Sequence, residues 1–117
     1  TQVIGAEPAQ ANDAWLGFKS GTRLAQFTPN TICDGLRATL GVRNFEIITE
    51  QVDDILLCSE EQVVEAMRLI WTRLKVICEP SCAVPLAMIM DQPEQFQGKR
   101  VGIILTGGNV DLDNLPW

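Results

Sequence analysis

Histidine is absent from this 117-residue chain, and several functions are excluded with it. Because histidine is the commonest general base in enzymes, no hydrolytic triad built on histidine can form within the chain. Four cysteines are present, with one CxxxC pair but no second clustered pair, so a zinc site is not expected. These cysteines are Cys33, Cys58, Cys78 and Cys82, and each lies in or beside an apolar segment. This placement favours buried, reduced thiols in a cytoplasmic protein.

Long apolar runs and clustered basic residues are missing as well. No apolar stretch reaches the roughly 18 residues that a membrane-spanning helix needs, so no membrane association is expected. The N-terminus has neither the basic region nor the hydrophobic run of a signal peptide. The net charge is −6, and Arg73 with Lys75 is the nearest approach to a basic patch, so nucleic acid is not expected as a partner. The composition, 46% hydrophobic and 21% charged, is typical of one small globular domain.

Strands and helices alternate along the chain, which predicts an α/β fold with a mostly parallel sheet flanked by helices. Strands are expected at residues 2–6, 45–48, 55–58 and 100–105. Helices are expected at residues 13–19, 59–75 and 81–90. The run at 100–105 is almost continuously apolar, which is typical of a strand buried on both faces of a parallel sheet.

The helix expected from Ser59 has the strongest local signals. Ser59 and Gln62 form a capping box, which satisfies backbone N–H groups at the start of a helix. An apolar stripe then recurs at helical spacing and is expected to face the core: Val63, Met67, Ile70 and Leu74. Ser81 is expected to cap the next helix in the same way.

Two carboxylates near the start of the chain are candidates for a metal site. Glu7 ends the first expected strand, and Asp13 follows after a loop that begins with Pro8. Such a loop can bring both carboxylates and the carbonyl of Ala11 around one hard cation, and oxygen ligands suit Mg²⁺ or Ca²⁺. In the alternative interpretation, Asp13 caps the helix that follows and Glu7 is solvated.

Three further segments place polar or glycine residues where ligands often bind. The strand expected at 100–105 ends in Thr106-Gly107-Gly108, and ligands bind outside the carboxyl ends of strands in open α/β sheets. The two glycines allow a close backbone approach, although strands also end in plain glycine corners. Asp34-Gly35 interrupts an apolar stretch and is a second candidate for a ligand-binding segment. The alternative interpretation is an ordinary turn. Glu79-Pro80-Ser81 leads into a helix N-terminus, which favours an anion or polar ligand, with a satisfied helix cap as the alternative.

Four ordered segments resemble those of the serine/threonine dehydratases. They are Val3-Ile4-Gly5-Ala6-Glu7-Pro8, Thr31-Ile32-Cys33-Asp34-Gly35-Leu36, Cys78-Glu79-Pro80-Ser81 and Leu105-Thr106-Gly107-Gly108-Asn109-Val110-Asp111. The resemblance runs from Val3 to Trp117. The family consists of fold-type II pyridoxal-phosphate enzymes and includes serine racemases and hydroxyaspartate dehydratases. Cys33 and Cys82 depart from the small residues usual at those positions, and Pro85 is unusual inside its helix.

The resemblance implies that residues 1–117 are the C-terminal portion of the large domain of such an enzyme. The family's Schiff-base lysine, substrate-carboxylate loop and glycine-rich phosphate cup lie upstream of the segments matched here. Lys19, Lys75 and Lys99 are the only lysines in the chain, and none has the expected context. The resemblance therefore implies no catalytic residue within these residues, and an inactive chain when it is isolated.

Several residues match positions at which the family binds its ligands. By resemblance, Thr106 bonds the pyridine nitrogen of pyridoxal phosphate, and a neutral hydroxyl there makes the ring a weaker electron sink than an aspartate would. The remaining matches to cofactor contacts are Gly35, Glu79 and Gly107. In the racemase-like branch, Mg²⁺ or Ca²⁺ is bound by residues that match Glu7, Ala11 and Asp13. A nucleotide effector binds between subunits of that branch, and two of its contacts match Lys75 and Asn109.

The activity that the resemblance implies is elimination of water from a β-hydroxy amino acid, with release of ammonia and a 2-oxo acid. Serine, threonine and 3-hydroxyaspartate are the implied substrates, and a homodimer completed by the remainder of the enzyme is the implied assembly. Serine racemisation is the alternative within the family. An alternative of another class is a catalytically inactive fragment that serves only as a binding or dimerisation module.

Overall fold

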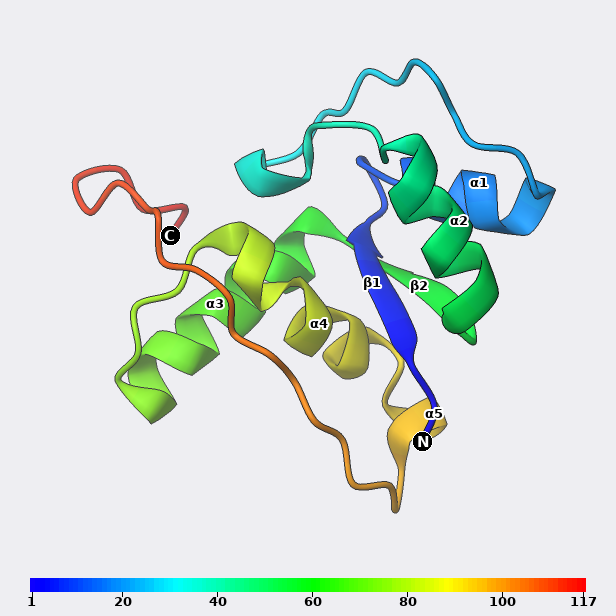
Figure 1. Ribbon diagram of the computed structural model, residues 1–117. Helices are drawn as coiled ribbons and strands as arrows, with labels where there is room; N and C mark the ends of the chain where they lie inside the picture. Colours follow the sequence, from blue (N-terminus) through cyan, green and yellow to red (C-terminus); the bar gives the residue numbers. More distant parts are fainter.

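Two parallel strands form the centre of the molecule, with helices on both sides (Figure 1). The computed structural model describes residues 1–117. In chain order its elements are β1 (Ile4–Pro8), α1 (Asp13–Ser20), the 3-10 turn η1 (Asp34–Leu36), α2 (Val42–Gln51), β2 (Asp54–Cys58), α3 (Glu60–Leu74), α4 (Pro80–Asp91) and α5 (Pro93–Phe96). The predicted α/β class with a parallel sheet is confirmed. No helix has both the length and the apolar character needed to cross a membrane.

The strand pair is in parallel register from Ile4 beside Asp54 to Pro8 beside Cys58. Helix α4 contacts both strands and packs along α3, whereas α1 contacts β2 and α2 from the other side. Because the two strands are parallel, both end at the same edge of the sheet, where the loops that follow β1 and β2 lie near the start of α4. The ends of parallel strands are the usual location of ligands in this class of fold.

The core lies between α3, α4 and the strand pair. Ser59 begins α3 as predicted, and its Oγ accepts a hydrogen bond from the N–H of Gln62 at 3.2 Å. The predicted stripe of α3 is buried except for Leu74, which lies in the last turn and is exposed. All four cysteines are buried and reduced, and they belong to a core cluster with Val63, Ala66, Met67, Ile70, Ala83, Val84, Ala87 and Met88.

The strand predicted at residues 45–48 is wrong, because these residues lie inside α2. Phe45 and Ile48 are the half-buried residues of this helix, and a spacing of three places them on one helical face. Phe45 packs over α1 at Gly17, where an added Cβ would lie 2.8 Å from the phenylalanine ring. A short apolar run does not distinguish a strand from a helix, so the contact with α1 decides the outcome.

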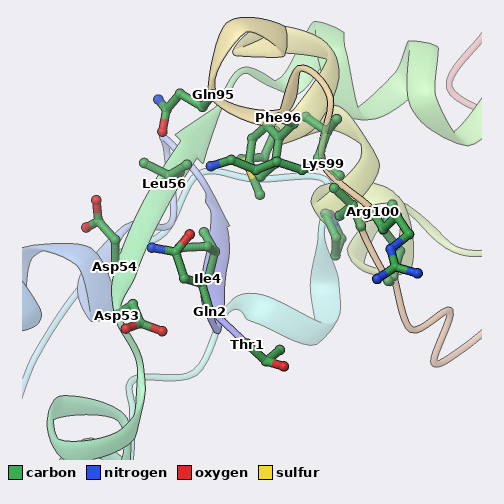
Figure 2. A pocket seen from close by; sticks show the side chains of 16 residues that line it. Thr1, Gln2, Ile4, Asp53, Asp54, Leu56, Gln95, Phe96, Lys99 and Arg100 are labelled. Carbon is green, nitrogen blue, oxygen red and sulfur yellow. The ribbon is translucent and has the colours of Figure 1, made fainter.

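The strand predicted at residues 100–105 is also wrong in this structure, because the segment is extended but has no strand beside it. Residues 97–117 run back along α4 without regular structure, coloured orange to red in Figure 1. A cavity of about 980 Å³ separates the segment from β1. In Figure 2, Ile4 and Leu56 from the strand pair line the cavity together with Phe96 at the end of α5 and Lys99 in the segment that follows.

Candidate functional site

The start of α4 brings together three of the four residues predicted to contact a cofactor. Glu79 occupies the N-cap position, and its N–H donates a hydrogen bond of 3.1 Å to the carbonyl of Gly107. Pro80 is the first helical residue, where a missing N–H costs no helical hydrogen bond. Ser81 in the same turn accepts a hydrogen bond from the N–H of Gly35. Two glycine-bearing loops, distant in sequence, are thus bonded to one helix turn.

The loop of Thr106 and Gly107 fits closely against the connection between α3 and α4. A Cβ added at Gly107 would overlap the Glu79 carboxylate, and one at Gly108 would lie 2.9 Å from the carbonyl oxygen of Ile77. Glycine at position 108 therefore allows the two backbones to approach, and glycine at position 107 leaves room for the Glu79 carboxylate. Thr106, the fourth predicted cofactor residue, is exposed beside Gly107.

The prediction that Ser81 caps α4 is wrong. The helix begins one residue earlier, at Pro80, and no side chain caps it. The Ser81 hydroxyl instead accepts the Gly35 N–H at 3.1 Å, and a Cβ at Gly35 would lie 3.0 Å from that oxygen. The link joins residues 46 apart, so no local sequence signal identifies it.

The loop that carries Gly35 is held by side chains that the sequence did not single out. Arg37 donates from Nη2 and Nε to the carbonyl of Thr31 at 2.8 and 3.2 Å. Glu60 Oε2 accepts the Ile32 N–H at 3.0 Å, although Glu60 Oε1 is buried without a partner. Burial raises the pKa of the Cys33 thiol in this loop to about 12, so the thiol is protonated and not a nucleophile at neutral pH.

Two tryptophans support the connection between α3 and α4 from behind. The indole N–H of Trp71 donates to the Cys78 carbonyl at 2.9 Å, one residue before Glu79. The ring of Trp117 meets Trp71 edge-on, with centroids 5.3 Å apart and an angle of 85° between the planes. The last residue of the chain therefore packs against a residue that helps to fix the start of α4.

The predicted metal ligands Glu7 and Asp13 lie at the junction of β1 and α1. Glu7 accepts hydrogen bonds from the N–H groups of Ala14 at 3.3 Å and Trp15 at 2.8 Å, so it caps α1 from the end of the strand. Asp13 is buried and accepts the Leu40 N–H at 3.1 Å through Oδ2. The alternative, with Asp13 as the cap and Glu7 solvated, is wrong.

The Glu7 carboxyl at this junction is harder to ionise than an exposed one. Burial, and secondarily the charge of Asp13, raise the pKa of Glu7 to about 7, against hydrogen bonds from Trp15 and Ala14 that lower it. The chain contains no cluster of three or more His, Cys, Asp or Glu side chains that could hold a metal ion. A cation here would therefore need the backbone carbonyl of Ala11, which belongs to a fully buried residue, together with water.

The two residues matched to a nucleotide effector lie on segments that meet. Lys75 ends α3 in the left-handed region, at φ 60°, and its N–H donates to the Trp71 carbonyl. Asn109 follows Gly108, which approaches the Ile77 carbonyl. Both side chains are exposed, and no hydrogen bond joins them.

Comparison with known proteins identifies the family of this chain. A sequence profile of the pyridoxal-phosphate dependent enzymes matches residues 1–107. The β-hydroxyaspartate dehydratase of Paracoccus denitrificans (strain Pd 1222) is 50% identical over 117 residues, which is 100% of this chain and 37% of that protein. The serine racemase of Dictyostelium discoideum is 43% identical, over 97% of this chain and 36% of that protein.

Solved structures show the same relationship. A threonine deaminase from T.th. superimposes with a TM-score of 0.88 and 41% identity, covering 95% of this chain and 41% of that one. Maize serine racemase superimposes with a TM-score of 0.89 and 34% identity, covering 96% and 36%. The chain thus spans little more than a third of the length of the curated relatives it matches. Because the profile match extends over most of the chain, the chain belongs to the pyridoxal-phosphate dependent enzyme family.

Proposed function

We propose that this chain is part of a pyridoxal-phosphate dependent dehydratase that removes water and ammonia from a β-hydroxy amino acid to leave a 2-oxo acid. The observation that carries the proposal is the meeting of Gly35, Glu79 and Gly107 around the first turn of α4. The names of the relatives favour 3-hydroxyaspartate as the first substrate to test, followed by serine and threonine. Serine racemisation is the alternative supported by the relatives named serine racemase.

The residues at this site fit a flat aromatic cofactor. When bound, pyridoxal phosphate supplies an electron sink for negative charge that develops at the substrate Cα. Thr106 offers its exposed hydroxyl to the pyridine nitrogen, and the side chains that lie against Gly35 and Gly107 are those of Ser81 and Glu79. The Glu79 carboxylate lies over Gly107, where it can accept a hydrogen bond from a group at the ring edge.

We also infer that residues 1–117 are the C-terminal portion of the large domain, with the lysine and phosphate-binding loop supplied upstream. The cavity between the strand pair and residues 99–103 supports this assignment, as does the absence of a second strand beside β1. Ile104 across from it is 80% exposed, which is unfavourable for a residue in an apolar run. One further strand in this gap would pair the edge of β1 and bury the run. The remainder of the enzyme is the proposed source of that strand, and the isolated chain is inactive.

Three further features of the proposal come from the family resemblance and from local chemistry. Glu7, the Ala11 carbonyl and Asp13 bind Mg²⁺ or Ca²⁺, which neutralises the acidic pair at the start of α1. Lys75 and Asn109 contact a nucleotide effector at the boundary between the subunits of a homodimer. A cytoplasmic location is inferred from the four reduced, buried cysteines.

The test is turnover by the full-length protein with pyridoxal phosphate. Ammonia and 2-oxo acid are measured with 3-hydroxyaspartate, serine and threonine, and D-serine is measured by chiral chromatography. Thr106→Ala is expected to lower kcat/KM at least tenfold and Thr106→Ser to preserve it. Thr72→Ala is the matched control, because Thr72 bonds only the Arg68 and Leu69 carbonyls of α3.

Each outcome separates the candidates. Ammonia and 2-oxo acid as the main products support the dehydratase, whereas D-serine formed from L-serine as the main product supports the racemase. If the full-length protein neither takes up pyridoxal phosphate nor turns over any of the three amino acids, both enzyme hypotheses are wrong. The remaining hypothesis is a binding or dimerisation module.

A further inference from the structure

Ser81 connects the loop of Gly35 to the helix turn that carries Glu79. Its Oγ accepts the Gly35 N–H at 3.1 Å, and this is its sole hydrogen bond. The oxygen is free for this contact because Glu79, not Ser81, occupies the N-cap position of α4. The N–H of Cys82 is already bonded to the Glu79 carbonyl at 3.1 Å. The hydroxyl therefore forms its hydrogen bond with the loop and not with the backbone of α4.

The contact also sets how closely the loop can approach. A Cβ at Gly35 would lie 3.0 Å from Ser81 Oγ and 3.4 Å from Ser81 Cβ, so backbone and side chain are in van der Waals contact. The loop is also bonded to two other helices, through the Ile32 N–H on Glu60 of α3 and the Leu40 N–H on Asp13 of α1. Glu60 fixes the beginning of the loop, and Ser81 fixes the turn at Gly35.

We propose that Ser81 is a positioning residue for the cofactor site, holding the Gly35 backbone at the spacing from Gly107 that the cofactor ring requires. The inference rests on the proposed function. The Gly107 carbonyl accepts the N–H of Glu79, and the Gly35 N–H donates to the hydroxyl of Ser81, two residues later than Glu79. The first turn of α4 therefore sets the positions of both glycine backbones. Removal of the hydroxyl releases Gly35 while the Glu79–Gly107 bond remains.

The test compares three variants of the full-length protein by titrating the apo-protein with pyridoxal phosphate and following its visible absorbance. Ser81→Ala is expected to raise the Kd of the cofactor about tenfold, the effect of one well-placed hydrogen bond. Ser81→Thr retains the hydroxyl and is expected to remain within about threefold of the wild type. Ser59→Ala is the matched control, because Ser59 Oγ accepts one N–H, at 3.2 Å, in the first turn of α3.

Thermal unfolding of the apo-proteins separates positioning from general stability. Ser59→Ala is expected to lower Tm with the cofactor Kd unchanged. The proposal is overturned if Ser81→Ala leaves the Kd unchanged, if Ser81→Thr does not restore it, or if Ser59→Ala raises it equally. A wild-type protein that takes up no pyridoxal phosphate contradicts the proposed function itself, so the two failures are distinguishable.

Discussion

Replacement of Gly107 by alanine tests how closely the loop after Leu105 must approach α4. A Cβ at this position would overlap the Glu79 carboxylate. Gly102 lies in the same extended segment, and a Cβ there would have no heavy atom within 4 Å. Gly102→Ala is therefore a matched control, with the same chemical change and no contact.

The expected magnitude follows from two opposing effects. Alanine restricts the unfolded chain at either position, which stabilises the folded state by about 0.4 to 1 kcal/mol. At Gly107 the overlap is with the end of the flexible Glu79 side chain, and turning this side chain away costs about 0.5 to 1.5 kcal/mol. Because the gain from the unfolded chain is the same at both positions, Gly107→Ala should be about 0.5 to 1.5 kcal/mol less stable than Gly102→Ala. Displacement of Glu79 should also weaken cofactor binding about tenfold.

Urea unfolding of the apo form of the full-length protein, followed by cofactor titration, measures both effects. A double-mutant cycle identifies the clash, because Gly107→Ala should cost little stability once Glu79 is alanine. Equal effects of Gly102→Ala and Gly107→Ala would refute the argument. So would a cost at Gly107 that is unchanged in the Glu79→Ala background.

Three more outcomes are expected. Mg²⁺ or Ca²⁺ should raise the Tm of the full-length protein by mass action, and Asp13→Ala should abolish the increase while leaving the cofactor absorbance intact; no shift in the wild type would contradict the metal site. The pKa of Glu7 is raised from 4.5 to about 7 in the folded state, so its contribution to stability is fully present below about pH 4.5 and is lost as the pH rises through about 7. In cation-free buffer that loss should be about 1 to 2 kcal/mol after allowance for solvent screening, and urea titrations should show it disappear in Glu7→Gln. The isolated chain should form no stoichiometric Schiff-base band with pyridoxal phosphate; a band lost on mutation of Lys19, Lys75 or Lys99 would show that the chain holds its own cofactor lysine.

The sequence predicted those elements whose signals are local. The start of α3 follows from Ser59 and Gln62, and its buried face follows from the apolar spacing, because both depend on residues within a few turns. Strand β2 and the short helix α1 were predicted within one or two residues of their observed bounds. Helix α2 was missed, because the run at Phe45 is too short to show its period without the contact at Gly17.

Candidate site residues were predicted from family motifs, but their connections were not. Nothing in the sequence places Ser81 beside Gly35 or makes Glu7 the cap of α1. The first contact joins residues 46 apart, which meet only after α4 has packed, and the second depends on the path of the loop between β1 and α1. The apolar run at 100–105 was predicted as a strand for a sound reason, but a strand needs a hydrogen-bonded neighbour, and β1 lies across a cavity.

The loop that carries Gly35 also links the candidate cofactor site to the candidate metal site. Its far end is fixed at Leu40, whose N–H donates to Asp13 Oδ2 at 3.1 Å and whose carbonyl accepts from Arg23 at 2.9 Å. Asp13 thus bonds the loop through Oδ2, while Ser81 bonds the same loop at Gly35, and the proposed cation would bind the other oxygen of Asp13. A cation bound at the proposed site would therefore act on the loop that borders the proposed cofactor site. Because such coupling is reciprocal, any factor by which a cation strengthens cofactor binding is the factor by which the cofactor strengthens cation binding.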